Sequence, residues 1–157
     1  MIWSKNGTFM PDEWGSLVHE IFSKIRTEAD AGRAVRPYIN DGTLDEEQAA
    51  KLVSIFKKMT DIECLKPAYS DDAVVLNEMD IHTSFGSVVR PDRYAVTRNG
   101  VILIDYKTGK HNEKYHQQLQ DYMVALREMN GNQGIKAYLV YLGEEVEVEE
   151  VRLDRLF

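Results

Sequence analysis

The stretch VVRPDRYAVTRNGVILIDYKTGK, residues 88–110, decides how this sequence is interpreted. It predicts two β-strands joined by a turn, because apolar residues alternate before the turn RNG and run together after it. Charged residues stand where an apolar strand would normally enter a core. Asp92 precedes the alternation of the first strand, and Asp105 and Lys107 interrupt the end of the second. These charges, rather than the strands themselves, need an explanation.

The turn sets the expected pairing of the two strands. The Asn-Gly pair at 99–100 is the strongest short signal for a two-residue hairpin turn. With this pair in the turn, Tyr94 faces Asp105 and Asp92 faces Lys107. We therefore predict that Asp92, Asp105 and Lys107 project from one face at one end of the hairpin. A register shifted by one residue would send Asp92 to the other face.

Such a cluster has two interpretations. Two neighbouring carboxylates repel each other unless a cation lies between them, and Mg²⁺ is often bound by one or two carboxylates together with substrate phosphate. A lysine beside them can orient water or stabilise developing negative charge, so the three residues suit metal-assisted phosphodiester hydrolysis. An exposed cross-strand ion pair between Lys107 and an aspartate explains the same residues without any function, and geometry alone does not separate the two.

Composition limits the class of protein. A chain of 157 residues forms one domain with a real core, and no apolar run reaches the length of a membrane span. The N-terminus lacks a secretory signal. Cys64 is the only cysteine, which excludes disulfides, a cysteine-based zinc site and an iron–sulfur cluster and indicates a reducing, cytoplasmic location. The net charge of -7 argues against bulk electrostatic gripping of nucleic acid, although basic residues gather around the hairpin.

Periodicity predicts a mixed α/β domain around one sheet. Helical spacing is expected at 14–35, 42–61 and 112–131, and a capping box is expected between Thr43 and Glu46. The strands are expected at 73–83, 87–97, 101–107, 135–143 and 145–153, with a loop at 65–72. Helices, three strands, a helix and two strands then follow one another along the chain.

The hairpin and its neighbours resemble the PD-(D/E)xK nuclease superfamily. The Pro-Asp element is present as Pro91-Asp92, and the D-x-K element as Asp105-Tyr106-Lys107. The closest resemblance is to the RecB-like domains at the C-termini of UvrD-type helicase-nucleases, the AddA and RecB proteins. The combination of RPDR with DYK-x-G is typical of versions from Bacteroidetes.

Three further elements of that branch are matched, and the resemblance covers residues 15–141. Its Q-x-x-x-Y helix is matched by Gln118 and Tyr122, and its G-x-x-x-H helix by Gly15 and His19. Glu78 matches the usual glutamate of the preceding strand. The resemblance implies a restriction-endonuclease-like α/β fold, a central mixed β-sheet flanked by α-helices. Residues 1–157 are expected to form a single nuclease domain, with 1–14 as an N-terminal segment or linker remnant and 15–157 as the RecB-like core.

The resemblance also implies roles for individual residues. The implied metal ligands are His19, Asp92, Asp105 and the backbone carbonyl of Tyr106, whose side chain need not matter. The implied catalytic residues are Asp92, Asp105, Lys107 near the attacking water, and Glu78 as an auxiliary acid. The implied residues that support the active site or contact DNA are Gln118, Tyr122, Arg90 and Arg93.

Each role has a structural alternative. His19 could be a half-buried helical histidine, and Glu78 could belong to an acidic solvent face with Asp80. Gln118 could lie on a polar helix face, and Tyr122 could belong to the core. Arg90 and Arg93 could be solvated surface residues as readily as contacts for DNA phosphate.

By the resemblance, the chain is a Mg²⁺-dependent DNA nuclease, with Mn²⁺ able to substitute, and processes DNA ends exonucleolytically in recombination and repair. The alternative is a catalytically inactive nuclease-like module that binds DNA or serves as a scaffold. The expected partners are DNA and a helicase motor in cis or in trans, without a membrane. No G-x-x-x-x-G-K-[ST] phosphate-binding loop occurs in the sequence, so the motor is not in this chain.

Overall fold

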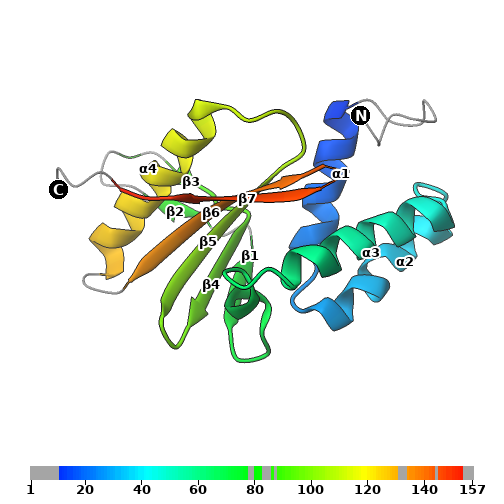
Figure 1. Cartoon of the computed structure of the whole chain (residues 1–157), viewed down its shortest axis with the longest axis horizontal. Helices are drawn as coiled ribbons and strands as arrows, with labels where there is room; N and C mark the ends of the chain where they lie inside the picture. Colours follow the sequence, from blue (N-terminus) through cyan, green and yellow to red (C-terminus); the bar gives the residue numbers. More distant parts are fainter. Residues whose placement is uncertain are drawn as a thin grey trace.

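The structure, a computed structural model, describes residues 11–77, 80–82, 86, 88–130, 134–143 and 145–153. Three helices come first along the described chain, followed by five strands, a fourth helix and two final strands (Figure 1). The helices are α1 (Pro11–Ser23), α2 (Ala31–Asn40), α3 (Glu46–Thr60) and α4 (Glu113–Asn130), with short 3-10 turns η2 (Glu28–Asp30) and η3 (Lys66–Tyr69). The strands are β1 (Val74–Asn77), β2 (Ile81–His82), β3 (Val88–Val89), β4 (Arg93–Thr97), β5 (Gly100–Lys107), β6 (Ile135–Leu142) and β7 (Val146–Val151).

A mixed five-stranded sheet lies at the centre of the molecule, and the α/β fold expected from the sequence is confirmed. Its strand order is β1-β4-β5-β6-β7, and only β5 and β6 pair in parallel. Parallel neighbours need a crossover, which α4 supplies. In Figure 1, α4 lies on one side of the sheet and α1, α2 and α3 lie on the other. This sandwich explains why β5 is buried along nearly its whole length.

Alternate residues of β5 contribute to two separate hydrophobic cores. Ile102, Ile104 and Tyr106 pack with the side chains of α1, α2 and α3, whereas Val101 and Leu103 pack with those of α4. Successive residues of a strand point to opposite faces, so Asp105 belongs to the α4 face together with Leu103. The catalytic candidates on β5 are therefore held between two cores at the end of the strand.

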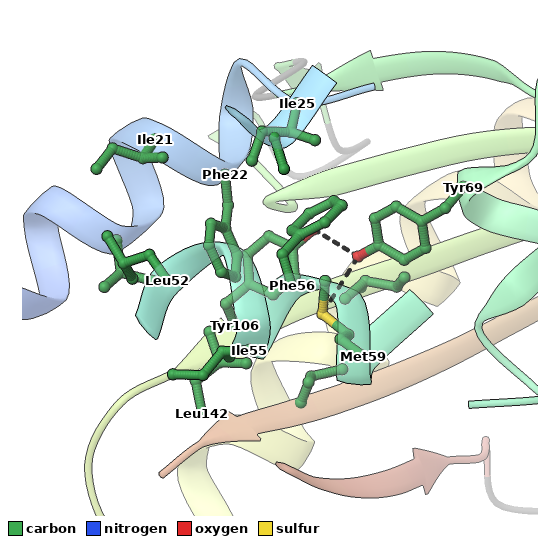
Figure 2. Packing of buried hydrophobic residues seen from close by; sticks show 14 of the residues in the cluster. Ile21, Phe22, Ile25, Leu52, Ile55, Phe56, Met59, Tyr69, Tyr106 and Leu142 are labelled. Carbon is green, nitrogen blue, oxygen red and sulfur yellow. Dashed lines mark hydrogen bonds between the residues drawn. The ribbon is translucent and has the colours of Figure 1, made fainter. Parts of the chain in front are cut away.

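Aromatic rings contact one another within the core beside α1 and α3 (Figure 2). Phe22 makes edge-to-face contacts with Phe56 and with Tyr106, at centroid separations of 5.1 and 5.3 Å. The hydroxyls of Tyr69 and Tyr106 share a hydrogen bond of 2.6 Å in this core. Tyr106 is only 1 % exposed, so its ring belongs to the core, and the expectation that only its carbonyl serves the metal site stays a prediction. Its ring fixes the peptide that follows Asp105.

The β4–β5 hairpin pairs in a register that differs by two residues from the predicted one. Tyr94 lies opposite Leu103 and Thr97 lies opposite Gly100, so residues 98–99 form the turn. The Thr97 hydroxyl accepts a hydrogen bond from the Asn99 amide, which stabilises this shorter turn. A shift of two residues keeps every side chain on its predicted face. Continued by one residue, the observed register brings Asp92 opposite Asp105.

Gly100 is needed for the approach of another strand rather than for the turn. Its φ is +129°, and a Cβ there would lie 2.3 Å from the carbonyl oxygen of Gly134, just before β6. That carbonyl accepts a hydrogen bond of 2.8 Å from the Val101 amide. The sequence prediction placed Gly100 in the turn because Asn-Gly is a turn signal. The parallel neighbour of β5 outweighs this local preference.

The predicted helix over 14–35 is two helices. α1 ends at Ser23, and the chain passes through η2 before α2 starts. The Asp30 carboxylate accepts a hydrogen bond of 3.2 Å from the Thr27 amide, and this local turn interrupts the helix. The capping box of α3 also differs from prediction, since it joins Asp45 and Gln48. Thr43 instead donates to the Asp41 carboxylate in the preceding turn.

Three predicted segments are subdivided in the structure. The strand expected at 73–83 contains β1 and β2, and the strand expected at 87–97 contains β3 and β4. The loop expected at 65–72 contains η3. β2 and β3 form a separate two-stranded sheet, while residues 90–92 pass between β3 and β4 outside either strand. Within the described residues, no helix is long and apolar enough to cross a membrane.

Candidate active site

Asp92, just before β4, and Asp105, near the end of β5, are joined by hydrogen bonds between their carboxylates and neighbouring backbone amides. The Asp92 amide donates a hydrogen bond of 3.0 Å to Oδ1 of Asp105. The Tyr106 amide donates a hydrogen bond of 2.9 Å to Oδ2 of Asp92. Each aspartate therefore binds backbone beside the other, and the hairpin aligns both carboxylates at one end. The sequence prediction that these residues share a face and an end of the hairpin agrees with this arrangement.

His19 approaches the two aspartates from α1. Its Nε2 lies 2.7 Å from the carbonyl oxygen of Tyr106 and 3.2 Å from Oδ2 of Asp92. Its Nδ1 lies 2.7 Å from the carbonyl oxygen of Gly15, one turn earlier. Both ring nitrogens face oxygen acceptors, and the hydrogen bond to Asp92 raises the pKa of His19, which favours the protonated ring. The structure thus joins a helix, a peptide carbonyl and a strand-end carboxylate at one point.

Gly15 allows α1 to come close to the loop that follows β5. A Cβ on Gly15 would lie 2.8 Å from the Thr108 hydroxyl oxygen. A larger residue would therefore require the Thr108 side chain to move away from α1. The spacing of Gly15 and His19 has two physical reasons, this close contact and the hydrogen bond between them.

The pKa values of Asp105 and His19 are both raised, but for different reasons. Burial, and then the charge of Asp92, raise the pKa of Asp105 from 3.8 to about 7. The hydrogen bond to Asp92 raises the pKa of His19 to about 9, against the opposing effect of burial. The site therefore retains protons that the same residues would lose in water. A cation that binds here has to displace these protons.

Lys107 is held beside the aspartates by side chains of α4. Its Nζ donates a hydrogen bond of 3.3 Å to Oε1 of Gln118 and lies 4.3 Å from the centroid of the Tyr115 ring. Tyr122 lies one turn after Gln118, and burial together with the charges of Asp105 and Asp92 raises its hydroxyl pKa. α4 therefore brings both predicted support residues, Gln118 and Tyr122, to the strand ends.

Comparison with known proteins agrees with this geometry. Residues 4–155 match the family profile described as the PD-(D/E)XK nuclease superfamily. The chain belongs to the PD-(D/E)XK nuclease superfamily. The sequence is also 27% identical over 169 residues to the A subunit of the ATP-dependent helicase/nuclease of Streptococcus equi subsp. zooepidemicus strain MGCS10565. The protein of the same name from Streptococcus sanguinis strain SK36 is 28% identical over 159 residues.

These matches cover most of this PD-(D/E)XK chain but little of the relatives. They include 96% and 89% of this chain, and 14% and 13% of the two Streptococcus proteins. The predicted resemblance to the nuclease superfamily and to the AddA type of helicase-nuclease is confirmed. The remaining length of the relatives has no counterpart in this chain.

PD-(D/E)XK nucleases generally use divalent metal ions. Among the residues that the structure describes, no group of three or more His, Cys, Asp and Glu side chains is arranged around a metal position. A proton on Nε2 of His19 would occupy the place of a cation, because this nitrogen lies 2.7 Å from the Tyr106 carbonyl oxygen and 3.2 Å from Oδ2 of Asp92. The donor set, two carboxylates, a carbonyl and an imidazole, fits a divalent cation once that proton is lost.

Arg93 corrects one prediction. It is 0% exposed, and its guanidinium binds the backbone carbonyls of Ile25, Arg26 and Ala68. It therefore has no surface to offer to DNA, and the expectation of a phosphate contact or a solvated surface residue is wrong. The physical reason is that the first residue of β4 points toward the helices on the far face of the sheet from α4.

The other predicted residues differ in what the structure shows. Arg90 is exposed and forms an ion pair of 2.6 Å with Asp80, and its backbone hydrogen-bonds the Tyr122 hydroxyl. Glu78 lies outside the described residues. Sequence reasoning missed Tyr115, whose ring makes a cation–π contact with the ammonium group of Lys107. Its signal was its position three residues before Gln118, on the same face of the α4 helix.

Proposed function

We propose that this chain is a Mg²⁺-dependent deoxyribonuclease domain that hydrolyses phosphodiester bonds at DNA ends, with Mn²⁺ able to replace Mg²⁺. The observation that supports it most directly is the interlocked pair of Asp92 and Asp105, with His19 and the Tyr106 carbonyl on one side and Lys107 on the other. The match to helicase/nuclease proteins supports a DNA substrate and a helicase in cis or in trans. We also propose a cytoplasmic location for the protein and residues 15–157 as the nuclease core.

The residues of the chain would divide the work between them. His19, Asp92, Asp105 and the Tyr106 carbonyl would hold the cation, which when bound polarises the phosphodiester and makes water a better nucleophile. Lys107, oriented by Gln118 and Tyr115, would place its positive charge where the phosphate gains negative charge. Tyr122 and Arg90 would contact the phosphate backbone or support this lysine. Glu78 would act as an auxiliary acid.

The test is cleavage of end-labelled linear single- and double-stranded DNA by the purified domain, with Mg²⁺ or Mn²⁺, beside an EDTA control. We expect degradation that starts at ends, needs the metal and is lost in Asp105→Ala and Lys107→Met. Lys136→Met is the matched control, because Lys136 is exposed on β6 near the opposite end of the sheet. Cleavage that continues in both active-site variants would contradict the assignment. A domain that binds metal and DNA but does not cut would favour an inactive DNA-binding module.

A further inference from the structure

Arg93, directly after Asp92, is a buried cation with an unusual set of partners. Its Nε donates to the Ala68 carbonyl at 3.1 Å, and one terminal nitrogen donates to the Ile25 carbonyl at 2.7 Å. The other terminal nitrogen donates to the Arg26 carbonyl and, at 3.0 Å, to Ala68. The guanidinium also stacks over the Tyr69 ring, 4.0 Å from its centroid. The Tyr106 hydroxyl also forms a hydrogen bond with Arg93, so the partners are backbone oxygens, an aromatic face and a neutral hydroxyl.

No carboxylate neutralises this charge. Within the described part of the chain, no Asp or Glu side chain forms an ion pair with Arg93. Removing a guanidinium from water is costly, and an apolar residue of similar size commonly gives equal or greater stability. Stability alone therefore does not explain a charged residue here. The planar fork does explain it, because only arginine presents five N–H donors in one fixed plane.

The three carbonyls belong to segments that build the active site. Ile25 and Arg26 follow the end of α1, the helix that carries His19, and their carbonyls have no further helical turn to bind. Ala68 lies in η3, next to Tyr69, whose hydroxyl bonds that of Tyr106. The guanidinium thus ties the end of α1 and η3 to the start of β4.

The geometry of β4 connects the contacts of Arg93 to the position of Asp92 in the active site. Successive residues of a strand project to opposite faces, so Arg93 is anchored under the helices while Asp92 turns toward the site. His19 meets Asp92 and the Tyr106 carbonyl across the boundary between α1 and the sheet. Arg93 lies along that boundary and binds both the segment at the end of α1 and η3. A loosened tie would let α1 shift relative to β4.

We propose that Arg93 is a positioning residue of the active site, whose guanidinium fixes α1 against β4 so that His19, Asp92 and the Tyr106 carbonyl keep one separation. The expected loss of cleavage in Arg93 variants rests on the proposed nuclease function. The structural consequence can be measured in the metal-free protein without any activity. The shape of the fork matters more than the charge, so lysine does not replace arginine.

The test compares Arg93→Lys with Arg98→Lys, the same change at an exposed position in the turn of the same hairpin. In the metal-free protein we expect faster hydrogen exchange at the amides of Asp92 and Tyr106, which bind the two carboxylates. The amide of Leu139 in β6 keeps its rate. Cleavage and Mn²⁺ affinity are expected to fall by about 10- to 100-fold, the usual effect of losing a residue that orients metal ligands. Arg98→Lys leaves all of these unchanged.

Uniformly faster exchange at all three amides, or unchanged exchange and cleavage in Arg93→Lys, would overturn the inference. If Arg93→Lys does not fold, Tyr69→Leu and Tyr69→Phe take its place, since both lose the hydroxyl but only leucine removes the ring under the guanidinium. The inference requires a larger effect on the Asp92 and Tyr106 amides in Tyr69→Leu, and equal effects overturn it. A wild-type domain that never cuts DNA would contradict the proposed function while the exchange measurements still decide the role of Arg93.

Discussion

Asp105 is a carboxyl group in a position where ionisation is unfavourable. It is 2 % exposed, and a second carboxylate, Asp92, lies beside it. Burial and that neighbour raise its pKa to about 7, so the metal-free protein keeps a proton that the unfolded chain releases near pH 4. Folding therefore opposes the ionised form that a metal ion needs. The same arrangement that destabilises the empty site makes it a good cation site.

The first prediction follows from that proton. Between about pH 4 and pH 7 the folded protein binds more protons at Asp105 than the unfolded chain, so its contribution to stability falls as pH rises through this window. Asp105→Asn removes the effect. In EDTA at pH 8 we expect the variant to be more stable than wild type by on the order of 2 kcal/mol, with almost no gain at pH 4. Thermal or urea unfolding at both pH values measures this.

Asp72→Asn, an exposed aspartate in the loop before β1, is the control and is expected to change neither value. Wild type and Asp105→Asn both keep the pair of His19 and Asp92, so the difference between them isolates Asp105. Equal stability of wild type and Asp105→Asn at pH 8 would mean that Asp105 ionises freely in the folded protein.

Single residues also show where sequence reasoning reaches its limit. Asp92, Asp105 and Lys107 were identified because charge at the end of an apolar strand is locally conspicuous. Arg93 was misplaced because, beside Asp92, it looks like one more surface charge. Its burial depends on carbonyls 25 and 67 residues away along the chain. No pattern in the sequence around Arg93 indicates that these carbonyls are its hydrogen-bond partners.

At the scale of elements, tertiary contacts explain the differences between predicted and observed structure. The Asn-Gly signal at 99–100 predicted the hairpin but gave a register two residues away, because Gly100 is taken by the approach of Gly134. The face of the site was predicted correctly since a shift of two preserves it. The split between α1 and α2 was missed because the apolar spacing continues through it. Fold class and helix faces followed from periodicity, whereas exact pairing required the neighbouring strand.

α1 carries a second prediction, through His19. His19→Ala should weaken Mg²⁺ and Mn²⁺ binding by about tenfold or more, which corresponds to about 1.4 kcal/mol. The physical reason is the loss of a nitrogen donor that lies beside the Tyr106 carbonyl and Asp92. Isothermal titration calorimetry measures the affinity. His82→Ala, at an exposed histidine of β2, serves as the control, and identical metal affinity in His19→Ala would make His19 a structural residue only.

α4 carries the third prediction. Tyr122 is buried against the sheet, and its hydroxyl binds the Arg90 backbone and Gln118. Tyr122→Phe keeps the packing of the ring and should change the free energy of unfolding by only about 1 kcal/mol. Cleavage should fall by about tenfold, because the lost hydroxyl holds Gln118, which in turn orients Lys107. Tyr138→Phe, a buried tyrosine outside the active site, is the control, and equal cleavage by both variants would place Tyr122 in the core alone.

At the scale of the whole molecule, an acidic chain has to act on an acidic polymer. The net charge is -7, and the basic side chains near the site are few. Lys107 is half-buried there, Lys110 and Lys114 are exposed between β5 and the first turn of α4, and Arg90 is paired with Asp80. Arg93 is buried, and Arg98 lies in the turn at the other end of the hairpin. The basic residues that the sequence gathers around the hairpin are thus divided among separate places by the fold.

The last prediction concerns how this domain holds DNA. Among the residues that the structure describes, about four basic side chains lie at the active-site end, so the dissociation constant should depend weakly on salt, with a log–log slope of magnitude below about 4 for duplex DNA. Fluorescence anisotropy of labelled DNA with the Asp105→Asn variant measures the slope without cleavage. Weak binding suits a domain that a helicase delivers to its strand, because a short flexible tether gives an effective concentration on the order of millimolar. A fusion of the domain to a single-stranded DNA-binding module should therefore cut at much lower protein concentration than the domain alone. A steep slope of about 8 together with nanomolar binding would show instead that the domain grips duplex DNA by itself, and the fusion would then bring no gain.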